Sequence, residues 1–101
     1  DIYTDILVID EVLYISKKKY RVPYNITLNF IWNILKVIKL IPLGEEVFTE
    51  LNDILQKYNL KPSDAIHLAA MKLEGINIIV SEDADYDKIK DVRRIWLSDS
   101  L

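Results

Sequence analysis

Apolar and polar residues along this chain follow a helical period in some segments and form short apolar runs in others. Tyr3 and Thr4 are expected to end a short strand, and Asp5 then begins a helix of about fifteen residues to Lys19, which Pro23 stops. Further helices are expected over 26–35, 45–58, 62–75 and 85–89, and further strands over 37–43, 77–81 and 94–97. Strands that alternate with helices favour parallel pairing and an α/β sandwich.

The same periods predict which side chains form the core. Five residues of the 45–58 helix are expected to face inward: Val47, Phe48, Leu51, Ile54 and Leu55. The strand 77–81 (NIIVS) is a continuous apolar run, which is typical of a strand buried on both faces. Tyr14, Trp32 and Trp96 lie at helical or strand spacing, so we interpret them as core residues. A chain of 101 residues with this pattern predicts one domain.

Composition narrows the class of protein. Half of the residues are apolar, which is enough for a packed core. The absence of cysteine excludes a disulfide framework and a zinc–thiolate site. The apolar runs are too short to span a bilayer, and no signal peptide is visible, so we expect a cytoplasmic protein without a membrane partner.

The net charge of −3 and the pI near 5.1 argue against a simple nucleic-acid coat protein. That objection is weaker for an enzyme whose bound metal ions meet the phosphate groups. The basic residues form two clusters: Lys17, Lys18, Lys19 and Arg21, then Lys88, Lys90, Arg93 and Arg94. We interpret both as solvated surface runs in preference to a substrate track.

Three acidic residues stand in settings where a carboxylate is costly. Glu11, Asp64 and Asp83 lie against an apolar stripe, at a helix start and just past an apolar strand, respectively. An ionised carboxylate removed from water needs a positive partner. A divalent metal ion with oxygen ligands can serve several carboxylates at once. The three residues therefore predict a metal-dependent nuclease.

Glu11 is the first of these candidates. Its neighbours three and four positions away in the helix are Leu7, Val8, Tyr14 and Ile15. Four apolar neighbours place the carboxylate on a stripe expected to be buried, which favours a functional role. The alternative is a glutamate at the edge of the stripe that reaches water.

Asp64 lies in the first turn of an alanine-rich helix. Its alternative role is structural, because an acidic residue there interacts favourably with the helix dipole, by about 0.3–1 kcal/mol. Together with the other two carboxylates, we favour a functional role. His67, the single histidine, follows one turn later, and we interpret it as a structural residue in preference to a substrate contact.

Asp83 follows the strand 77–81 by two residues, where open parallel sheets place their ligands. Four acids within 82–87 repel one another unless cations intervene. Asp83 is the favoured ligand and Asp85 a second candidate. The alternative is that either residue caps the short helix that follows. Ser81 is either a group that orients a metal-bound water or an ordinary turn residue.

Two segments resemble motifs of PIN-domain ribonucleases. The segment TDILVIDEVLY, which contains Glu11, is similar to the second motif of that family. The segment LKPSDAIHLAAMKLEGINIIVSEDADYDKI is similar to the third and fourth motifs in order. In it an aspartate opens an alanine-rich helix, a Ser-x-Asp follows the next strand, and an aromatic residue, Tyr86, comes soon after.

The resemblance implies a three-layer sandwich in which helices flank a parallel sheet. It also implies an Mg²⁺- or Mn²⁺-dependent endoribonuclease similar to VapC-type toxins of type II toxin–antitoxin modules, with RNA as substrate and a cognate antitoxin as partner. A homodimer is expected, with Phe30 and Trp32 as candidates for its interface. By the resemblance, the catalytic metal ligands are Glu11, Asp64 and Asp83, with Asp85 as a further ligand and Ser81 as a supporting residue.

One family feature has no counterpart here. The first PIN motif is an aspartate that ends an N-terminal strand near the middle of the sheet, and nothing in this sequence matches it. We therefore expect a single PIN-like domain over 1–101 that lacks this strand, and a chain that is inactive by itself. The alternative function is a catalytically inactive PIN-scaffold module for protein–protein interaction. A purely structural α/β domain is the third interpretation.

Overall fold

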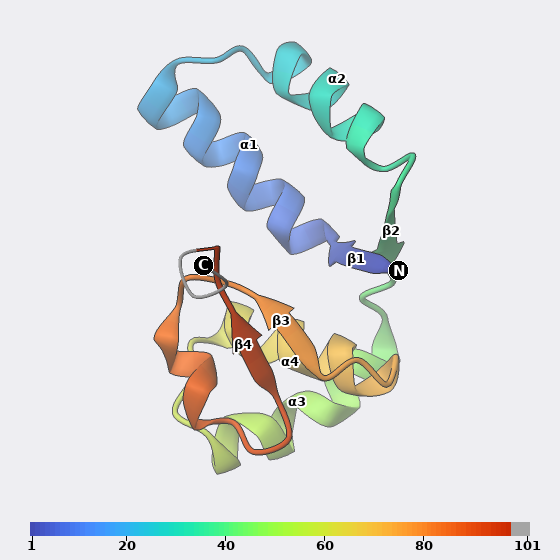
Figure 1. The fold of residues 1–101 in the computed structure, drawn as a ribbon, viewed down its shortest axis with the longest axis vertical. Helices are drawn as coiled ribbons and strands as arrows, with labels where there is room; N and C mark the ends of the chain where they lie inside the picture. Colours follow the sequence, from blue (N-terminus) through green and yellow to red (C-terminus); the bar gives the residue numbers. More distant parts are fainter. Residues whose placement is uncertain (98–101) are drawn as a thin grey trace. The chain divides into compact units, whose positions relative to one another are not determined.

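The computed structural model describes residues 1–97, and they form two compact units divided between residues 43 and 44 (Figure 1). The first unit contains β1 (Ile2–Asp5), α1 (Ile6–Tyr20), α2 (Tyr24–Ile34) and β2 (Ile38–Ile41). The second contains α3 (Glu45–Lys57), α4 (Pro62–Leu73), β3 (Ile78–Val80), the 3₁₀ helix η1 (Ala84–Lys88) and β4 (Arg93–Ile95). The order of helices and strands predicted from the sequence is confirmed, with ends shifted by no more than two residues.

In the first unit, one residue ends a strand and begins a helix. β1 and β2 pair in parallel, and their register runs from Ile2 opposite Ile38 to Asp5 opposite Ile41. The carboxylate of Asp5 accepts hydrogen bonds from the backbone N–H groups of the two residues that follow Ile6, at 3.0 and 3.2 Å. Asp5 therefore caps α1 and satisfies donors that have no partner inside the helix.

α1 and α2 form a helical hairpin, which Figure 1 shows in blue and cyan. α1 ends where Arg21 adopts a left-handed backbone (φ 58°) and donates its N–H to the carbonyl of Lys17 at 3.1 Å. Pro23 then precedes the first residue of α2. The hydroxyls of Ser16 and Thr27 lie 2.9 Å apart and join the two helices, and Thr27 is only 6% exposed.

The hairpin leaves most of its apolar side chains exposed. α1 contains no buried residue, and Thr27 is the one buried residue of α2. The prediction that Tyr14 and Trp32 belong to the core is wrong, because they are 55% and 72% exposed. Within the unit, two helices and two short strands cover only a narrow seam of each helix, so helical spacing alone did not identify the covered face.

The core of the second unit lies between α3 and α4, where small residues let the helices approach closely. Ile54 of α3 and Leu68 of α4 are 1% and 0% exposed, and three alanines of α4 are equally buried: Ala65, Ala69 and Ala70. α4 ends at Leu73, two residues before the predicted stop at Gly75, whose φ of +69° is a backbone conformation that side-chain-bearing residues rarely adopt. Close packing of this helix pair positions α4, whose first turn carries Asp64.

The buried face of α3 is narrower than the sequence predicts. Val47 and Ile54 are buried, as expected, but Phe48 and Leu55 are 66% and 39% exposed, which corrects their assignment to the core. Residues 47 and 54 are seven positions apart and lie on one line along the helix, whereas 48 and 55 lie on the next line. α4 covers only the first line.

β3 and β4 also pair in parallel, from Ile78 opposite Arg93 to Val80 opposite Ile95. The predicted α/β class with parallel strands is therefore confirmed, although residues 1–97 form two pairs of strands rather than one continuous sheet. The prediction that 77–81 is buried on both faces is wrong, since Ile78 and Val80 are 49% and 61% exposed. A continuous apolar run indicates a strand but does not supply the layers that would cover it.

Trp96, just after β4, is half-buried, so its assignment to the core is only partly met. None of the helices within residues 1–97 combines the length and the apolar character needed to cross a membrane.

The α3–α4 core predicts unequal effects of two truncations in the same helix. Ile54→Ala removes a fully buried side chain, so it should lower the free energy of unfolding by about 2–5 kcal/mol. Phe48→Ala removes a larger but exposed side chain and should change it by less than about 0.5 kcal/mol. Urea unfolding followed by circular dichroism measures both. Equal losses would contradict the burial described here.

Candidate functional site

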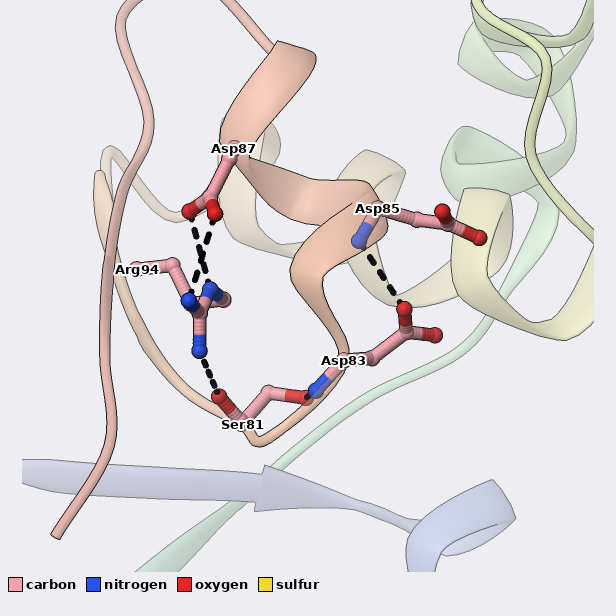
Figure 2. A network of polar contacts seen from close by, with 5 residues as sticks. All are labelled: Ser81, Asp83, Asp85, Asp87 and Arg94. Carbon is pink, nitrogen blue, oxygen red and sulfur yellow. Dashed lines mark hydrogen bonds and ion pairs between the residues drawn. The ribbon is translucent and has the colours of Figure 1, made fainter. Parts of the chain in front are cut away.

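The turn between β3 and β4 holds two of the four candidate acidic residues, Asp83 and Asp85, together with Ser81 (Figure 2). The Ser81 hydroxyl accepts a hydrogen bond from the backbone N–H of Asp83 at 3.1 Å. The Asp83 carboxylate in turn accepts one from the N–H of Asp85 at 2.9 Å, so Asp83 caps η1. The structural roles considered for Ser81 and Asp83 are therefore present, and they hold the turn in one conformation.

Arg94 of β4 binds the same turn on the side of η1 opposite to Asp83 and Asp85, as Figure 2 shows. Its Nε and Nη2 donate to the two carboxylate oxygens of Asp87 at 2.8 and 3.2 Å. Its Nη1 donates to the backbone carbonyl of Ser81 at 3.0 Å. The Arg94 side chain is 15% exposed, so the interpretation of Arg94 as part of a solvated basic run is wrong.

This ion pair changes the electrostatics of the acidic turn. The hydrogen bond from Arg94 lowers the pKa of Asp87; desolvation partly opposes this effect, and the positive charge of Arg94 adds to it. The sequence predicted that four neighbouring acids require cations. For Asp87 that cation is a guanidinium of the protein itself, in the fork geometry that binds a carboxylate through two hydrogen bonds.

Asp64 is connected to the acidic turn through a tyrosine. The hydroxyl of Tyr86, in η1, donates to Asp64 Oδ1 at 3.2 Å, and the Tyr86 residue is 2% exposed. Asp64 lies in the first turn of α4 and is half-buried, and no side chain caps that helix. Since Tyr86 is three residues beyond Asp83, the turn that carries Asp83 also orients the carboxylate of Asp64.

Sequence reasoning missed both of these contacts. Tyr86 was noted only as an aromatic residue after the acidic motif, and Arg94 only as a member of a basic cluster. The contact between Tyr86 and Asp64 spans 22 positions, a spacing that no local period predicts. The one available signal was a tyrosine within an acidic segment, because a buried tyrosine hydroxyl usually has a hydrogen-bond partner.

Glu11 belongs to the first unit, on α1, and it is exposed. Its neighbours Val8, Tyr14 and Ile15 are 37%, 55% and 40% exposed, and Leu7 is half-buried. The prediction that Glu11 lies on a buried stripe is therefore wrong, for the reason given for the hairpin as a whole. Its assignment as a metal ligand stays a prediction. His67, in α4, is half-buried.

The second unit supplies carboxylates of the kind that a hard divalent cation prefers. Asp64 and Asp83 each use one oxygen, for Tyr86 and Asp85 respectively, and within residues 1–97 the other oxygen of each has no hydrogen-bond partner. Those residues contain no group of three or more His, Cys, Asp or Glu side chains arranged to hold a metal ion. The donor chemistry fits Mg²⁺ or Mn²⁺.

The chain belongs to the PIN domain family, whose model matches residues 1–92. PIN domains are generally nucleases. Two solved structures share the fold. A toxin–antitoxin complex from Klebsiella pneumoniae matches with a TM-score of 0.68 and 22% identity, over 87% of this chain and 68% of that one. The DNA-bound VapBC of Salmonella typhimurium matches with a TM-score of 0.73 and 11% identity, over 93% and 74%.

These matches confirm the resemblance to PIN domains noted in the sequence and the PIN-like α/β fold it implied. A search of proteins with curated descriptions found no match to this chain.

The ion pair of Arg94 predicts a pH-dependent contribution to stability. Because the folded-state pKa of Asp87 lies below its ordinary value of 3.8, the contribution is present above that value and lost as the pH falls through the folded pKa. Asp87→Asn should therefore lower the melting temperature at pH 7 and pH 5, and the difference from the parent protein should disappear near pH 2.

Glu82→Gln is the matched control, because it removes one exposed negative charge from the same turn. It should leave the melting temperature unchanged at all three pH values. Thermal unfolding followed by circular dichroism measures both variants. A loss for Asp87→Asn that persists unchanged at the lowest pH would contradict the charged Arg94–Asp87 interaction.

Proposed function

We propose that the full-length protein is an Mg²⁺- or Mn²⁺-dependent endoribonuclease that hydrolyses RNA phosphodiester bonds, that it is the toxin of a type II toxin–antitoxin module, and that the 101-residue chain is inactive by itself. The observation that carries the proposal is the placement of Asp64 and Asp83 within a PIN domain. They stand at the start of α4 and just after β3, with Tyr86 between them. The two solved toxin–antitoxin structures that share the fold support the toxin assignment.

In this proposal the metal ligands are the residues predicted from the sequence: Glu11, Asp64, Asp83 and Asp85. A bound divalent ion would activate a water for in-line attack and stabilise the departing 3′ oxygen. The protein holds the carboxylates in position. Ser81 accepts the backbone N–H of Asp83, the N–H of Asp85 occupies one oxygen of the Asp83 carboxylate, and Tyr86 occupies one oxygen of Asp64. The second oxygen of each carboxylate is left for the ion.

We further propose a cognate antitoxin and a second copy of this chain as protein partners. The hairpin supports a protein interface, because Phe30 and Trp32 of α2 are 63% and 72% exposed. The same observation favours the alternative function, a catalytically inactive PIN scaffold that only binds other proteins. Cleavage assays decide between the two, because the alternative predicts no hydrolysis of RNA under any metal condition.

Asp64→Asn and Asp83→Asn, each made in the full-length protein, should reduce RNA cleavage by about 100-fold or more, because loss of even an outer-shell partner of a metal costs about 10–100-fold. The substitution keeps the shape and the hydrogen-bond acceptor but removes the charge that a metal ligand needs. Cleavage of labelled RNA measures the effect, and an unchanged thermal melt shows that the fold persists. Asp53→Asn, an exposed carboxylate of α3, should cleave normally. Normal cleavage by Asp64→Asn would contradict the assignment of Asp64 as a metal ligand of the nuclease.

Metal selectivity provides an independent test. Oxygen ligands without cysteine predict that Mg²⁺ or Mn²⁺ supports cleavage and that chelation by EDTA stops it. Titration calorimetry with Mn²⁺ should detect binding by the parent protein and weaker binding by Asp83→Asn. Activity restored only by Zn²⁺ would contradict this ligand set.

A further inference from the structure

The charges of this acidic protein are divided unevenly along the chain. Between Glu11 and Glu45 there are six basic residues and no acidic one. This interval includes most of α1, all of α2 and β2. Four of these six basic residues lie within 17–21, where α1 ends, so the net charge of −3 hides a basic segment where a polyanion would meet positive potential.

Four side chains gather at the end of the hairpin where α1 passes into α2. Tyr14, Lys17 and Lys18 lie on one face of α1, because they are three and four positions apart. Lys17 also lies over the ring of Tyr24, the first residue of α2, with its Nζ 5.1 Å from the ring centre. We call Tyr14, Lys17, Lys18 and Tyr24 the lysine–tyrosine surface.

The rings on this surface are open to a ligand. Tyr14 and Tyr24 are 55% and 51% exposed. Lys18 lies over the Tyr14 ring at 5.1 Å and donates to its hydroxyl at 2.8 Å, so its ammonium group is held beside an aromatic face. Lys19, Tyr20 and Arg21 extend the same combination, since Lys19 lies 5.5 Å from the ring centre of Tyr20, which is 65% exposed.

Stability of the hairpin does not account for this composition. Three lysines in the last turn of α1 interact favourably with the helix dipole, which explains their charge. It does not explain why large aromatic rings stand half-exposed beside each ammonium group. Cations that meet phosphates and rings that stack on bases are the combination with which proteins bind single-stranded nucleic acid.

We propose that the lysine–tyrosine surface binds single-stranded RNA, with Lys17 and Lys18 against phosphates and Tyr14 and Tyr24 stacked on bases. This replaces the interpretation of residues 17–21 as a solvated run. The inference rests on the proposed function only for the identity of the nucleic acid as RNA. It adds a docking surface made of residues that take no part in metal binding.

The test is the salt dependence of RNA binding by the full-length protein. A short fluorescein-labelled single-stranded RNA is titrated in EDTA, where no cleavage occurs, and fluorescence anisotropy gives the affinity between about 50 and 200 mM salt. Each phosphate contact of a single strand contributes about 0.7 to the slope of log affinity against log salt. The double variant Lys17→Gln/Lys18→Gln should flatten that slope by about 1.4.

The control is the double variant Lys57→Gln/Lys72→Gln. It removes the same charge, and its two lysines are likewise exposed and lie in the last turns of α3 and α4. Lys57 also lies over a tyrosine ring, that of Tyr58, at 5.4 Å. The control should keep the slope of the parent protein. Equal flattening by both double variants, or by neither, overturns the proposal.

The aromatic part has its own variant. Tyr14→Ala should weaken binding by about fivefold or more without changing the salt slope, because stacking releases no counterions. The proposal is overturned in favour of an acidic protein partner if Tyr14→Ala leaves the affinity for RNA unchanged and polyglutamate displaces the labelled RNA as well as unlabelled RNA does. Circular dichroism checks that each variant is folded.

This result and that of the proposed nuclease are separable. Asp64→Asn should bind the labelled RNA as tightly as the parent protein while losing cleavage. If Asp64→Asn cleaves normally and the lysine–tyrosine surface still sets the salt slope, the nuclease assignment fails and the RNA-binding surface stands. If cleavage depends on Asp64 but the Lys17→Gln/Lys18→Gln variant binds like the parent protein, the surface fails and the nuclease assignment stands.

Discussion

The guanidinium of Arg94 meets three oxygens, the two of the Asp87 carboxylate and the backbone carbonyl of Ser81. These contacts join β4 to η1 and to the end of β3, a strand whose Ile78 and Val80 are 49% and 61% exposed. A short parallel pair of strands is weak by itself. The hydrogen bonds of the Arg94 guanidinium therefore fix the turn that contains Asp83. In a larger sheet, a buried apolar core would fix such a turn.

The same turn is connected to α4 through Tyr86. Tyr86 is buried in the second unit and directs its hydroxyl to Asp64, whose helix is held against α3 by Ile54 and Leu68. Asp64 thus depends on two kinds of support, apolar packing beneath its helix and one hydrogen bond at its carboxylate. Both carboxylates keep one oxygen engaged by the protein, which restricts their rotamers before any ligand arrives. Such restriction lowers the entropy lost on binding.

The local pattern of residues along the sequence predicted the helices and strands of this fold well. It predicted poorly which side chains are buried. Proline, glycine and capping residues act on the chain around them, so the ends of α1 at Asp5 and of α4 near Gly75 follow from the sequence. Whether Phe48 is covered depends on which face of α3 packs against α4. That packing involves residues distant in the sequence, so the local pattern around Phe48 does not predict it. The site divides in the same way. The positions of Asp64 and Asp83 and the cap that Asp83 makes on η1 were predictable, but the contact of Tyr86 with Asp64 and that of Arg94 with Asp87 were not.

The choice of partner for Arg94 bears on both proposed activities, phosphate binding and metal binding. A cation beside a carboxylate neutralises it and competes with a metal for its oxygens. In the described part of the acidic turn, Arg94 binds Asp87 and leaves Asp83 to a backbone N–H. The lysines that we assign to phosphate contacts belong to α1, where tyrosine rings rather than carboxylates lie against them. In the proposed function, cations that lie beside rings attract RNA without neutralising the acids that a metal-dependent nuclease requires.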